Sequence, residues 1–331
     1  MEYRRLGRCG LKLSALSLGT ATFGDSVDVK AAREFVAASL DAGINHFDTA
    51  EVYAGSRSEQ VLGEVLADLK PSRLGIVVST KFALGLSKGP NSSNTLNRKY
   101  LLDAIDGSLQ RLKLDHVDLV YCHWPDRETP IEETIWALHN LIERGKALYW
   151  GTSNFTPEQI RAAWDIAERH HLHKPVVEQS EYNLLFSSRV KNGMKRLIED
   201  TGLGVTAYSP LAGGVLSGKY RQGAAPGSRA TDPKIAMFHA TLLDQRRNEI
   251  AGKLGEIAAD IGTSLAAMAL AWCLTDARIS SVILGVTKPD QLAANLAAMA
   301  VLPKLTPEVL ARIDGVLDGY DQSWMPYSEH P

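Results

Sequence analysis

The sequence has few cysteines, no long apolar run and no segment that looks like a secretory signal. Its three cysteines, Cys9, Cys122 and Cys273, are far apart and odd in number, so they predict neither a disulfide framework nor a CxxC metal site. The longest apolar run, residues 265–274, has ten residues, whereas a membrane span needs about 20. The first residues, MEYRRLGRCG, lack the apolar core of a signal peptide. We therefore expect a cytoplasmic protein that is not inserted in a membrane.

The sequence also lacks an excess of charge. Lys plus Arg number 36 and Asp plus Glu number 38, which gives a formal net charge of −2 over 331 residues. Non-specific binding to nucleic acid depends on a strong basic field, so we expect no nucleic-acid partner. Hydrophobic residues make up 45% of the chain and charged residues 22%, as is usual for a globular protein with a large core.

Short apolar runs alternate with stretches of helical period along most of the chain. The expected strands are 16–18, 44–47, 75–80, 117–122, 147–150, 176–179, 204–208 and 281–284. Helices are expected at about 30–42, from 58, and at 101–112, 131–141, 157–169, 189–199 and 289–297. Strands that alternate with helices indicate a parallel sheet, and eight such units favour a closed (β/α)8 TIM barrel, of the α/β class, over an open sheet. We expect residues 1–331 to form a single domain, with 3–13 as a β-hairpin that caps the bottom of the barrel.

Two segments interrupt the alternation. Residues 210–241, after the seventh strand, are rich in glycine and have little periodicity, and so long a loop in a compact domain is usually functional or disordered. Residues 213–220 nearly match a P-loop, but Tyr220 stands where the Mg²⁺-binding Ser or Thr belongs. We therefore set aside an NTPase, although glycines beside Lys219 leave room for a pyrophosphate near the backbone. The tail after Gly319 is also irregular. The open-sheet GxGxxG fingerprint is absent from the sequence.

Ionisable residues stand where three successive predicted strands end. Asp48 follows the second strand, Lys81 the third and His123 the fourth, and Tyr53 lies five residues beyond Asp48. Active sites of parallel barrels form at the carboxyl ends of the strands, and neighbouring strands are about 4.8 Å apart. We therefore expect Asp48, Lys81 and His123 in one row, with Tyr53 in a loop that folds over them.

This set of residues is suited to protonating a carbonyl oxygen. Asp48 supplies the counter-charge that a buried lysine needs, and the Lys81 ammonium is expected to lower the pKa of the Tyr53 phenol so that it can act as a general acid. His123 can donate a hydrogen bond to the same oxygen. Taken singly, each residue has a structural alternative: an ion pair for Asp48 and Lys81, a packed aromatic for Tyr53, and a hydrogen-bonded core histidine for His123.

Two further features have plainer interpretations. Trp124 is read first as a packing residue and second as a pocket wall. His170, His171 and His173 could be metal ligands, but they lie at a predicted helix C-terminus, where histidine is favourable in any case. We therefore expect no metal site, and a metal-dependent hydrolase is a weak alternative because clustered ligands are missing.

Several stretches resemble the aldo-keto reductase superfamily, and the resemblance extends over essentially the whole chain. It is carried by FDTAEVY (47–53), STK (79–81), HWPD (123–126), GTSN (151–154), EQSEYN (178–183), AYSPLAGGVLSGKY (207–220) and LGVTKPDQLAAN (284–295). The chain is most similar to the branch of the potassium-channel β-subunit-like reductases. The resemblance implies a barrel that binds NADPH/NADP⁺ without a Rossmann domain. It also implies Tyr53 as proton donor, Lys81 and Asp48 as its tuning partners, and His123 as the residue that orients a carbonyl substrate.

The resemblance further implies a set of cofactor-binding residues. Ser153, Asn154 and Gln179 match positions that hold the nicotinamide carboxamide, and Tyr208 matches the aromatic that stacks on the nicotinamide ring. The long loop would wrap the pyrophosphate, and the last strand and helix would hold the adenosine end. The remaining implied cofactor positions are Gly19, Thr20, Asp48, Ser209, Pro210, Leu211, Gly213, Lys219, Arg229, Gly285, Thr287, Lys288, Gln291 and Asn295, and those of the substrate pocket are Ala21, Phe82 and Trp124.

The helix expected after Lys288 offers independent support for phosphate binding, because a helix N-terminus beside a lysine attracts anions. Lys288 and Arg229 would favour NADP over NAD, although Lys288 can also be read as a solvated surface residue. Ala21 replaces the tryptophan of many channel-subunit relatives, which leaves the substrate size open. His123 is present where channel-associated members often lack it, which favours a working reductase. The alternative is a redox-sensing NADP(H)-binding subunit of a channel-like partner, and the resemblance also implies a homotetramer.

Overall fold

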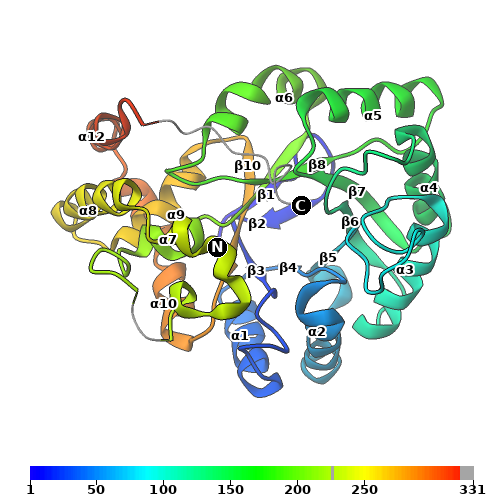
Figure 1. Cartoon of the computed structure of the whole chain (residues 1–331), viewed down its shortest axis with the longest axis horizontal. Coiled ribbons are helices and arrows are strands. Elements are labelled where there is room, and N and C mark those ends of the chain that lie inside the picture. The colour runs from blue at the N-terminus through cyan, green and yellow to red at the C-terminus, as the bar shows by residue number, and fades with distance from the viewer. Residues whose placement is uncertain (225–226, 321–331) are drawn as a thin grey trace.

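The computed structural model describes residues 1–224 and 227–320. Within these residues, eight parallel strands close into a barrel in the order β10-β3-β4-β5-β6-β7-β8-β9, and the strands occupy the centre of the view in Figure 1. This confirms the predicted α/β barrel. The barrel strands are β3 (Leu16–Gly19), β4 (His46–Asp48), β5 (Val77–Phe82), β6 (Val117–Cys122), β7 (Ala147–Ser153), β8 (Val177–Glu181), β9 (Gly204–Tyr208) and β10 (Ile279–Gly285).

Helices follow the strands and cover the outside of the barrel (Figure 1). Several begin at a side chain that caps the first turn; Thr156 and Gln159, for example, form a capping box at the start of the helix that Pro157 opens. The helices between successive strands include α1 (Val29–Asp41), α2 (Arg57–Leu69), α3 (Arg98–Leu112), α4 (Ile131–Glu143), α5 (Pro157–Arg169) and α6 (Lys195–Thr201).

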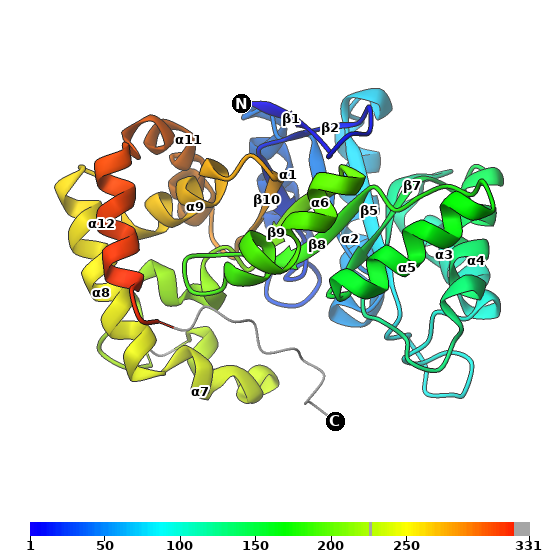
Figure 2. The ribbon, with the colours of Figure 1, turned by 90° about the horizontal axis from the view of Figure 1, so that it is seen from above.

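The N-terminal hairpin closes one end of the barrel, as predicted. Strands β1 (Tyr3–Arg5) and β2 (Lys12–Ser14) pair antiparallel, and Leu6 and Leu13 join a buried cluster with the first residue of strands β5 and β8. A Cβ on Gly7 would lie 2.2 Å from the carbonyl oxygen of Gly202, so only glycine fits this approach. Figure 2 shows the hairpin and helix α7 (His239–Leu242) at opposite ends of the barrel.

Between β9 and β10 the structure contains helices that the sequence pattern did not predict. The described parts of this loop, residues 210–224 and 227–241, contain short 3₁₀ turns and the start of α7, and α8 (Gln245–Asp260) and α9 (Leu265–Thr275) follow. Helix α9 buries nine of its eleven residues, so it is apolar all round and has no period-3.6 stripe to recognise.

Smaller differences lie elsewhere in the chain. The helix expected at 189–199 is a π-helical turn (Arg189–Gly193) followed by α6, and the strand expected at 147–150 extends to Ser153. Beyond β10 come α10 (Pro289–Leu296), as predicted, and α11 (Ala298–Val301) and α12 (Pro307–Leu317), which were not. Of the irregular C-terminal tail, residues 321–331 lie outside the described residues.

In the described ranges no single helix is both long and apolar enough to cross a membrane. Helices α8 and α9 reach that length and hydropathy only when taken together, and they meet at an angle of 89°.

Candidate active site

The predicted row of ionisable residues is present at the carboxyl ends of three adjacent strands. Asp48 ends β4, Lys81 is the penultimate residue of β5, and His123 directly follows β6. The pairing of β4 with β5 and of β5 with β6 places these strands side by side. Tyr53 opens the 3₁₀ turn Tyr53–Ser56, which lies between β4 and α2.

Lys81 links the acidic and phenolic members of this row. Its side chain is fully buried, and its Nζ donates to Asp48 Oδ1 at 2.5 Å, to the carbonyl oxygen of Thr49 at 2.8 Å and to Tyr53 Oη at 3.3 Å. All three ammonium protons therefore have acceptors. Burial by itself lowers the pKa of Lys81, but the charge of Asp48, the contact with Tyr53 and the hydrogen bonds to both together outweigh burial, so the pKa is raised. Lys81 thus remains an ammonium at neutral pH.

Asp48 is held from several sides. Besides the bond from Lys81, its Oδ2 accepts from Ser79 Oγ at 2.7 Å and from Gln179 Nε2 at 3.1 Å. Burial raises the pKa of this carboxyl, but the Lys81 charge and the donated hydrogen bonds outweigh burial, so the pKa is lowered. Since Gln179 comes from β8, the carboxylate is fixed from across the barrel interior.

The structure corrects the expectation that the pKa of Tyr53 is lowered. Burial raises it, the Lys81 ammonium lowers it and the Asp48 carboxylate raises it again, and the result is a raised pKa. Lys81 does act on the phenol, as expected, but its charge is largely balanced by Asp48 at 2.5 Å. Tyr53 is therefore a neutral phenol at neutral pH, a form that can give up a proton.

His123 lies beside Tyr53. The two rings meet edge to face with centroids 5.7 Å apart and an interplanar angle of 83°. Burial, together with the Lys81 charge, lowers the pKa of His123 to about 3, so the ring is neutral. Its Nδ1 is buried and has no hydrogen-bond partner among the described residues. An unpaired buried nitrogen at the end of a barrel strand marks a place where a ligand can bind.

A polar chain that the sequence pattern did not predict continues from Asp48 into the barrel. Ser79 Oγ, which donates to Asp48, lies 2.9 Å from His46 Nε2, and His46 Nδ1 lies 2.8 Å from Ser17 Oγ. Burial lowers the pKa of His46 to about 4, so its ring is neutral and can donate from one nitrogen and accept at the other. The alternation of buried polar residues in β3, β4 and β5 was the signal available in the sequence.

The residues matched to the nicotinamide end lie together at the ends of β7, β8 and β9. Tyr208 Oη donates to Asn154 Oδ1 at 2.9 Å, and Asn154 Nδ2 donates to Ser153 Oγ at 3.1 Å. Gln179 contacts Asp48, as described above, and so connects this group to the ionisable row. Asn154 has a left-handed backbone, with φ of 64°, a conformation that asparagine tolerates better than most residues.

Three cations gather where the phosphates of a dinucleotide were expected. Partial burial, then the neighbouring Arg229, then Lys288 lower the pKa of Lys219, which means that the three positive charges repel one another. Among the described residues none of the three forms an ion pair with an acidic side chain. Gly214, with φ of 110°, lies so close that a Cβ there would be 2.9 Å from Lys219 Nζ. Cations without an acidic partner beside glycine backbone fit phosphate groups.

Four other residues that were expected to bind the cofactor make contacts within the protein or lie at a close approach of two strands. Thr20 is fully buried, and its hydroxyl contacts the carbonyl oxygen of Asp48 and Ser58 Oγ, so its side chain serves the fold. Gln291 Oε1 accepts from the backbone N–H of Thr287 at 2.8 Å. Asn295 is buried in α10. At Gly19 a Cβ would lie 2.8 Å from Ile283, because β3 and β10 are close there.

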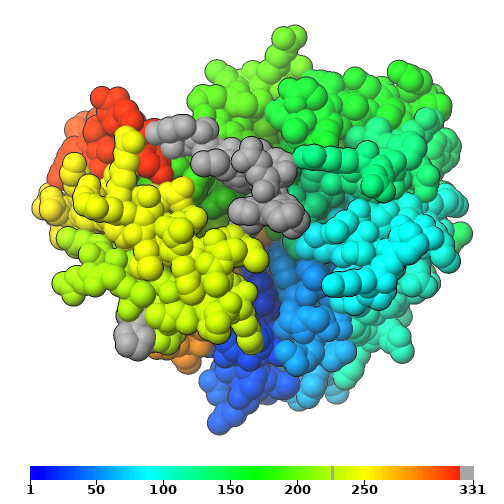
Figure 3. All heavy atoms as spheres, in the orientation of Figure 1, coloured from blue at the N-terminus to red at the C-terminus, as the bar shows by residue number. Residues whose placement is uncertain are grey.

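The three predicted pocket residues differ in exposure. Phe82 is fully buried and packs edge to face against Tyr100, so it belongs to the core and not to an open pocket. Ala21 is exposed and Trp124 half-buried. The implied positions Ser209, Pro210, Leu211 and Gly213 follow β9, and Gly285 ends β10. Figure 3 shows the chain after β9 in yellow-green and yellow on the left of this face, and the cyan chain after β5 on the right.

The barrel, the paired lysine and aspartate and the adjoining tyrosine together define an oxidoreductase-type (β/α)8 site. Residues 15–318 match the Aldo/keto reductase family. Two similar proteins are both named "Probable voltage-gated potassium channel subunit beta". One, from Oryza sativa subsp. japonica, is 45% identical over 320 residues, and the other, from Arabidopsis thaliana, is 42% identical over 320 residues; each alignment covers 96% of this chain and 97% of the relative.

The chain therefore belongs to the aldo/keto reductase family. This family generally binds nicotinamide cofactors and acts on small carbonyl substrates. Membership supports NAD(P)H-dependent oxidoreduction for this chain.

Proposed function

We propose that this protein is an NADPH-dependent reductase of aldehydes or ketones, with Tyr53 as the general acid. The observation that carries the proposal is the buried Lys81 ammonium, whose Nζ contacts both Asp48 and Tyr53 Oη. A phenol beside a fixed positive charge can lose its proton to a substrate oxygen, because the resulting phenolate is stabilised where it forms.

When the cofactor is bound, it supplies the hydride that reduces the carbonyl carbon. Ser153, Asn154 and Gln179 would hold its nicotinamide carboxamide, and Tyr208 would lie against the ring. Lys219, Arg229 and Lys288 would neutralise its phosphates. Burial and then the charges of Arg229 and Lys288 lower the pKa of Lys219, so a bound anion would relieve the repulsion on Lys219. The charge of Lys288 and Arg229 would favour the additional phosphate of NADPH over NADH.

The remaining residues act on the substrate oxygen. His123 is neutral, so it can donate one hydrogen bond to the carbonyl oxygen without competing for its proton. Tyr53 transfers its phenolic proton to that oxygen as the carbon is reduced, and Lys81 stabilises the phenolate until a proton from solvent restores the phenol. Asp48 keeps Lys81 charged and in position.

Substitution of Tyr53 by Phe tests the proposal because it removes only the proton donor. We expect turnover to fall by roughly 10²- to 10⁴-fold, as is usual when a general acid is lost, with NADPH binding retained. The assay is oxidation of NADPH, with NADH in parallel, over a panel of small aldehydes and ketones. Tyr149→Phe is a matched control, since Tyr149 packs against the cluster at the hairpin end of the barrel. Equal rates for Tyr53→Phe and wild type would remove Tyr53 from its assigned role.

A second candidate function follows from the names of the relatives. Both are described as probable channel β subunits, so this chain can instead be a subunit that binds NADP(H) and reports its redox state to a membrane partner. Tight NADPH binding with no turnover of any carbonyl in the panel, together with a stoichiometric membrane protein in a pull-down of the full chain, would favour this function. Turnover that depends on Tyr53 would favour the reductase.

A further inference from the structure

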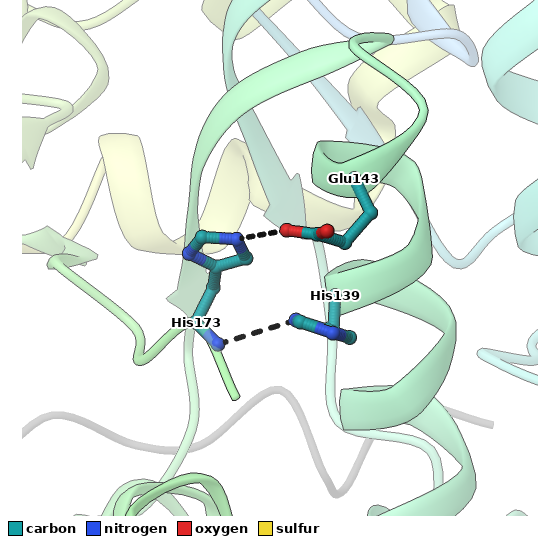
Figure 4. Close-up of side chains that lie close together, drawn as sticks. All are labelled: His139, Glu143 and His173. Atoms are coloured by element: carbon teal, nitrogen blue, oxygen red, sulfur yellow. Dashed lines mark hydrogen bonds and ion pairs between the residues drawn. The ribbon is translucent and has the colours of Figure 1, made fainter. Parts of the chain in front are cut away.

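A cluster of metal-ligating side chains lies outside the candidate active site. His139 and Glu143 are four residues apart in the last turns of α4, and His173 lies in the segment between α5 and β8. Figure 4 shows the three side chains gathered between the helix and this segment. A spacing of i, i+4 places two side chains on one face of a helix, and the third ligand comes from a neighbouring element.

The geometry of the cluster is close to that of a metal site. One ligand atom from each residue lies within 4.8 Å of the other two. His173 Nε2 is already 2.9 Å from Glu143 Oε1, and the His139 and His173 ring centroids are 5.0 Å apart. Tetrahedral zinc with ligands at about 2.0–2.1 Å requires ligand atoms roughly 3.4 Å apart. Small rotations of the exposed Glu143 and His173 side chains would bring their ligand atoms to this spacing around the half-buried His139.

The backbone that carries His173 is fixed. The indole N–H of the buried Trp150 donates to the carbonyl oxygen of His173 at 2.7 Å, and the backbone N–H of His173 reaches His139 Nδ1 at 3.4 Å. Trp136 packs edge to face against His139, with centroids 5.9 Å apart. The N–H contact turns His139 Nδ1 toward the segment that carries His173, and its length makes it a weak hydrogen bond.

The local charge also suits a cation. Glu143 is the last residue of α4. Helix C-termini carry partial negative charge and favour cations. The Glu143 carboxyl lies 2.9 Å from His173 Nε2 and supplies an oxygen ligand to the cluster.

We propose that His139, Glu143 and His173 form a binding site for one divalent transition-metal ion of the zinc class, with the fourth position taken by water. Two imidazoles and one carboxylate form a ligand set that zinc uses in proteins. The ion would join α4 to the segment before β8 and would stabilise the folded chain. The site is distinct from the His170, His171 and His173 group considered from the sequence, because only His173 of that group belongs to the cluster.

Zinc binding to the full chain without a purification tag tests this site. Titration calorimetry with zinc chloride should show one ion per chain, and metal analysis after dialysis should agree. His173→Ala and Glu143→Gln should each weaken binding by at least roughly tenfold, since even changes around metal ligands cost 10- to 100-fold. Cobalt should give the visible absorption of a tetrahedral site, and His139→Ala should abolish that absorption.

His171→Ala is the matched control, since His171 is an exposed neighbouring histidine outside the cluster. It should bind zinc as the wild type does. Melting curves in chelator should coincide for all variants, which shows that they fold, whereas zinc should raise the melting temperature of the wild type and of His171→Ala only. The proposal is overturned if the wild type takes up no stoichiometric zinc or if His173→Ala binds zinc as well as His171→Ala does.

Discussion

Two of the ion pairs that the described residues form with a buried acid lie on opposite sides of the barrel wall, and they are used differently. Inside the barrel, Lys81 pairs with Asp48 at 2.5 Å. Outside it, Glu178 of β8 pairs with Arg189 at 2.9 Å, since Glu178 adjoins the inward-facing Gln179 and side chains alternate along a strand. Both acids are almost inaccessible to solvent.

The two pairs differ in how their remaining hydrogen bonds are used. Arg189 also donates to Ser180 Oγ and to the carbonyl oxygen of Phe155, so its charge joins a strand to neighbouring segments. Lys81 instead directs a donor at Tyr53 Oη. The pKa of Glu178 is raised, because burial outweighs Arg189, whereas that of Asp48 is lowered. A buried charge becomes chemically useful when one of its donors reaches a group at the open end of the barrel.

Removal of Lys81 should have the largest effect, because it removes both stability and chemistry. Lys81→Met leaves the Asp48 carboxylate buried without its partner, which we expect to cost about 3–5 kcal/mol in the free energy of unfolding. Carbonyl reduction should fall to the background rate even in molecules that are folded. Urea unfolding measures the first effect, and turnover per folded molecule measures the second. A folded Lys81→Met enzyme with normal turnover would contradict the role of the interior pair.

Removal of Arg189 should lower the stability of the protein without lowering its turnover. Arg189→Met leaves Glu178 unpaired, and we expect a loss of stability of a similar size, about 3 kcal/mol or more. Turnover per folded molecule at low temperature should remain within about twofold of the wild type, because Arg189 does not touch the ionisable row. If turnover falls as far as in Lys81→Met, the division between a chemical and a structural pair is wrong.

The buried His46, in the polar chain that leads from Asp48 into the barrel, should make the stability of the protein depend on pH. The substitution His46→Gln should reduce this dependence. The pKa of His46 is about 4 in the folded protein, below the ordinary value of about 6.5, so the unfolded chain binds more protons between these pH values. Stability should therefore fall as the pH drops from 6.5 to 4, with a contribution from His46 of about 3 kcal/mol. Denaturation at several pH values should show a shallower acid limb for His46→Gln. An unchanged limb would contradict a neutral buried His46, and His171→Gln is the surface control.

The smallest effect on stability is expected at the three cations that we propose bind the phosphates of the cofactor. Since the neighbouring Arg229 and Lys288 help to lower the pKa of Lys219, Lys219→Gln should relieve repulsion and raise the free energy of unfolding by less than about 1 kcal/mol. The same change should raise KM for NADPH roughly tenfold, because a charged hydrogen bond is lost. A variant that is more stable but binds NADPH more weakly would identify Lys219 as a ligand-binding residue. A variant that is less stable and also binds NADPH more weakly would indicate a structural role.

Part of this site could be predicted from sequence because its residues stand at strand ends. Asp48, Lys81 and His123 each follow an apolar run, and the rule that parallel strands end at one face brings them together. Helices α8 and α9 could not be placed in the same way, since α9 is apolar on all sides and has no helical stripe. Phe82 was expected in the substrate pocket, but alternation along β5 turns its side chain into the core.

The sequence by itself determined the order of strands and helices, the barrel, and the residue types at its carboxyl end, because these follow from local periodicity and chain connectivity. Only the tertiary structure decided the charge state of those residues. The Tyr53 phenol has a raised pKa, and His123 and His46 are neutral, because burial and the balance between Lys81 and Asp48 depend on distances across several strands. The grouping of His139 and Glu143 with His173 has the same origin, since contacts between distant segments are formed only when the chain folds.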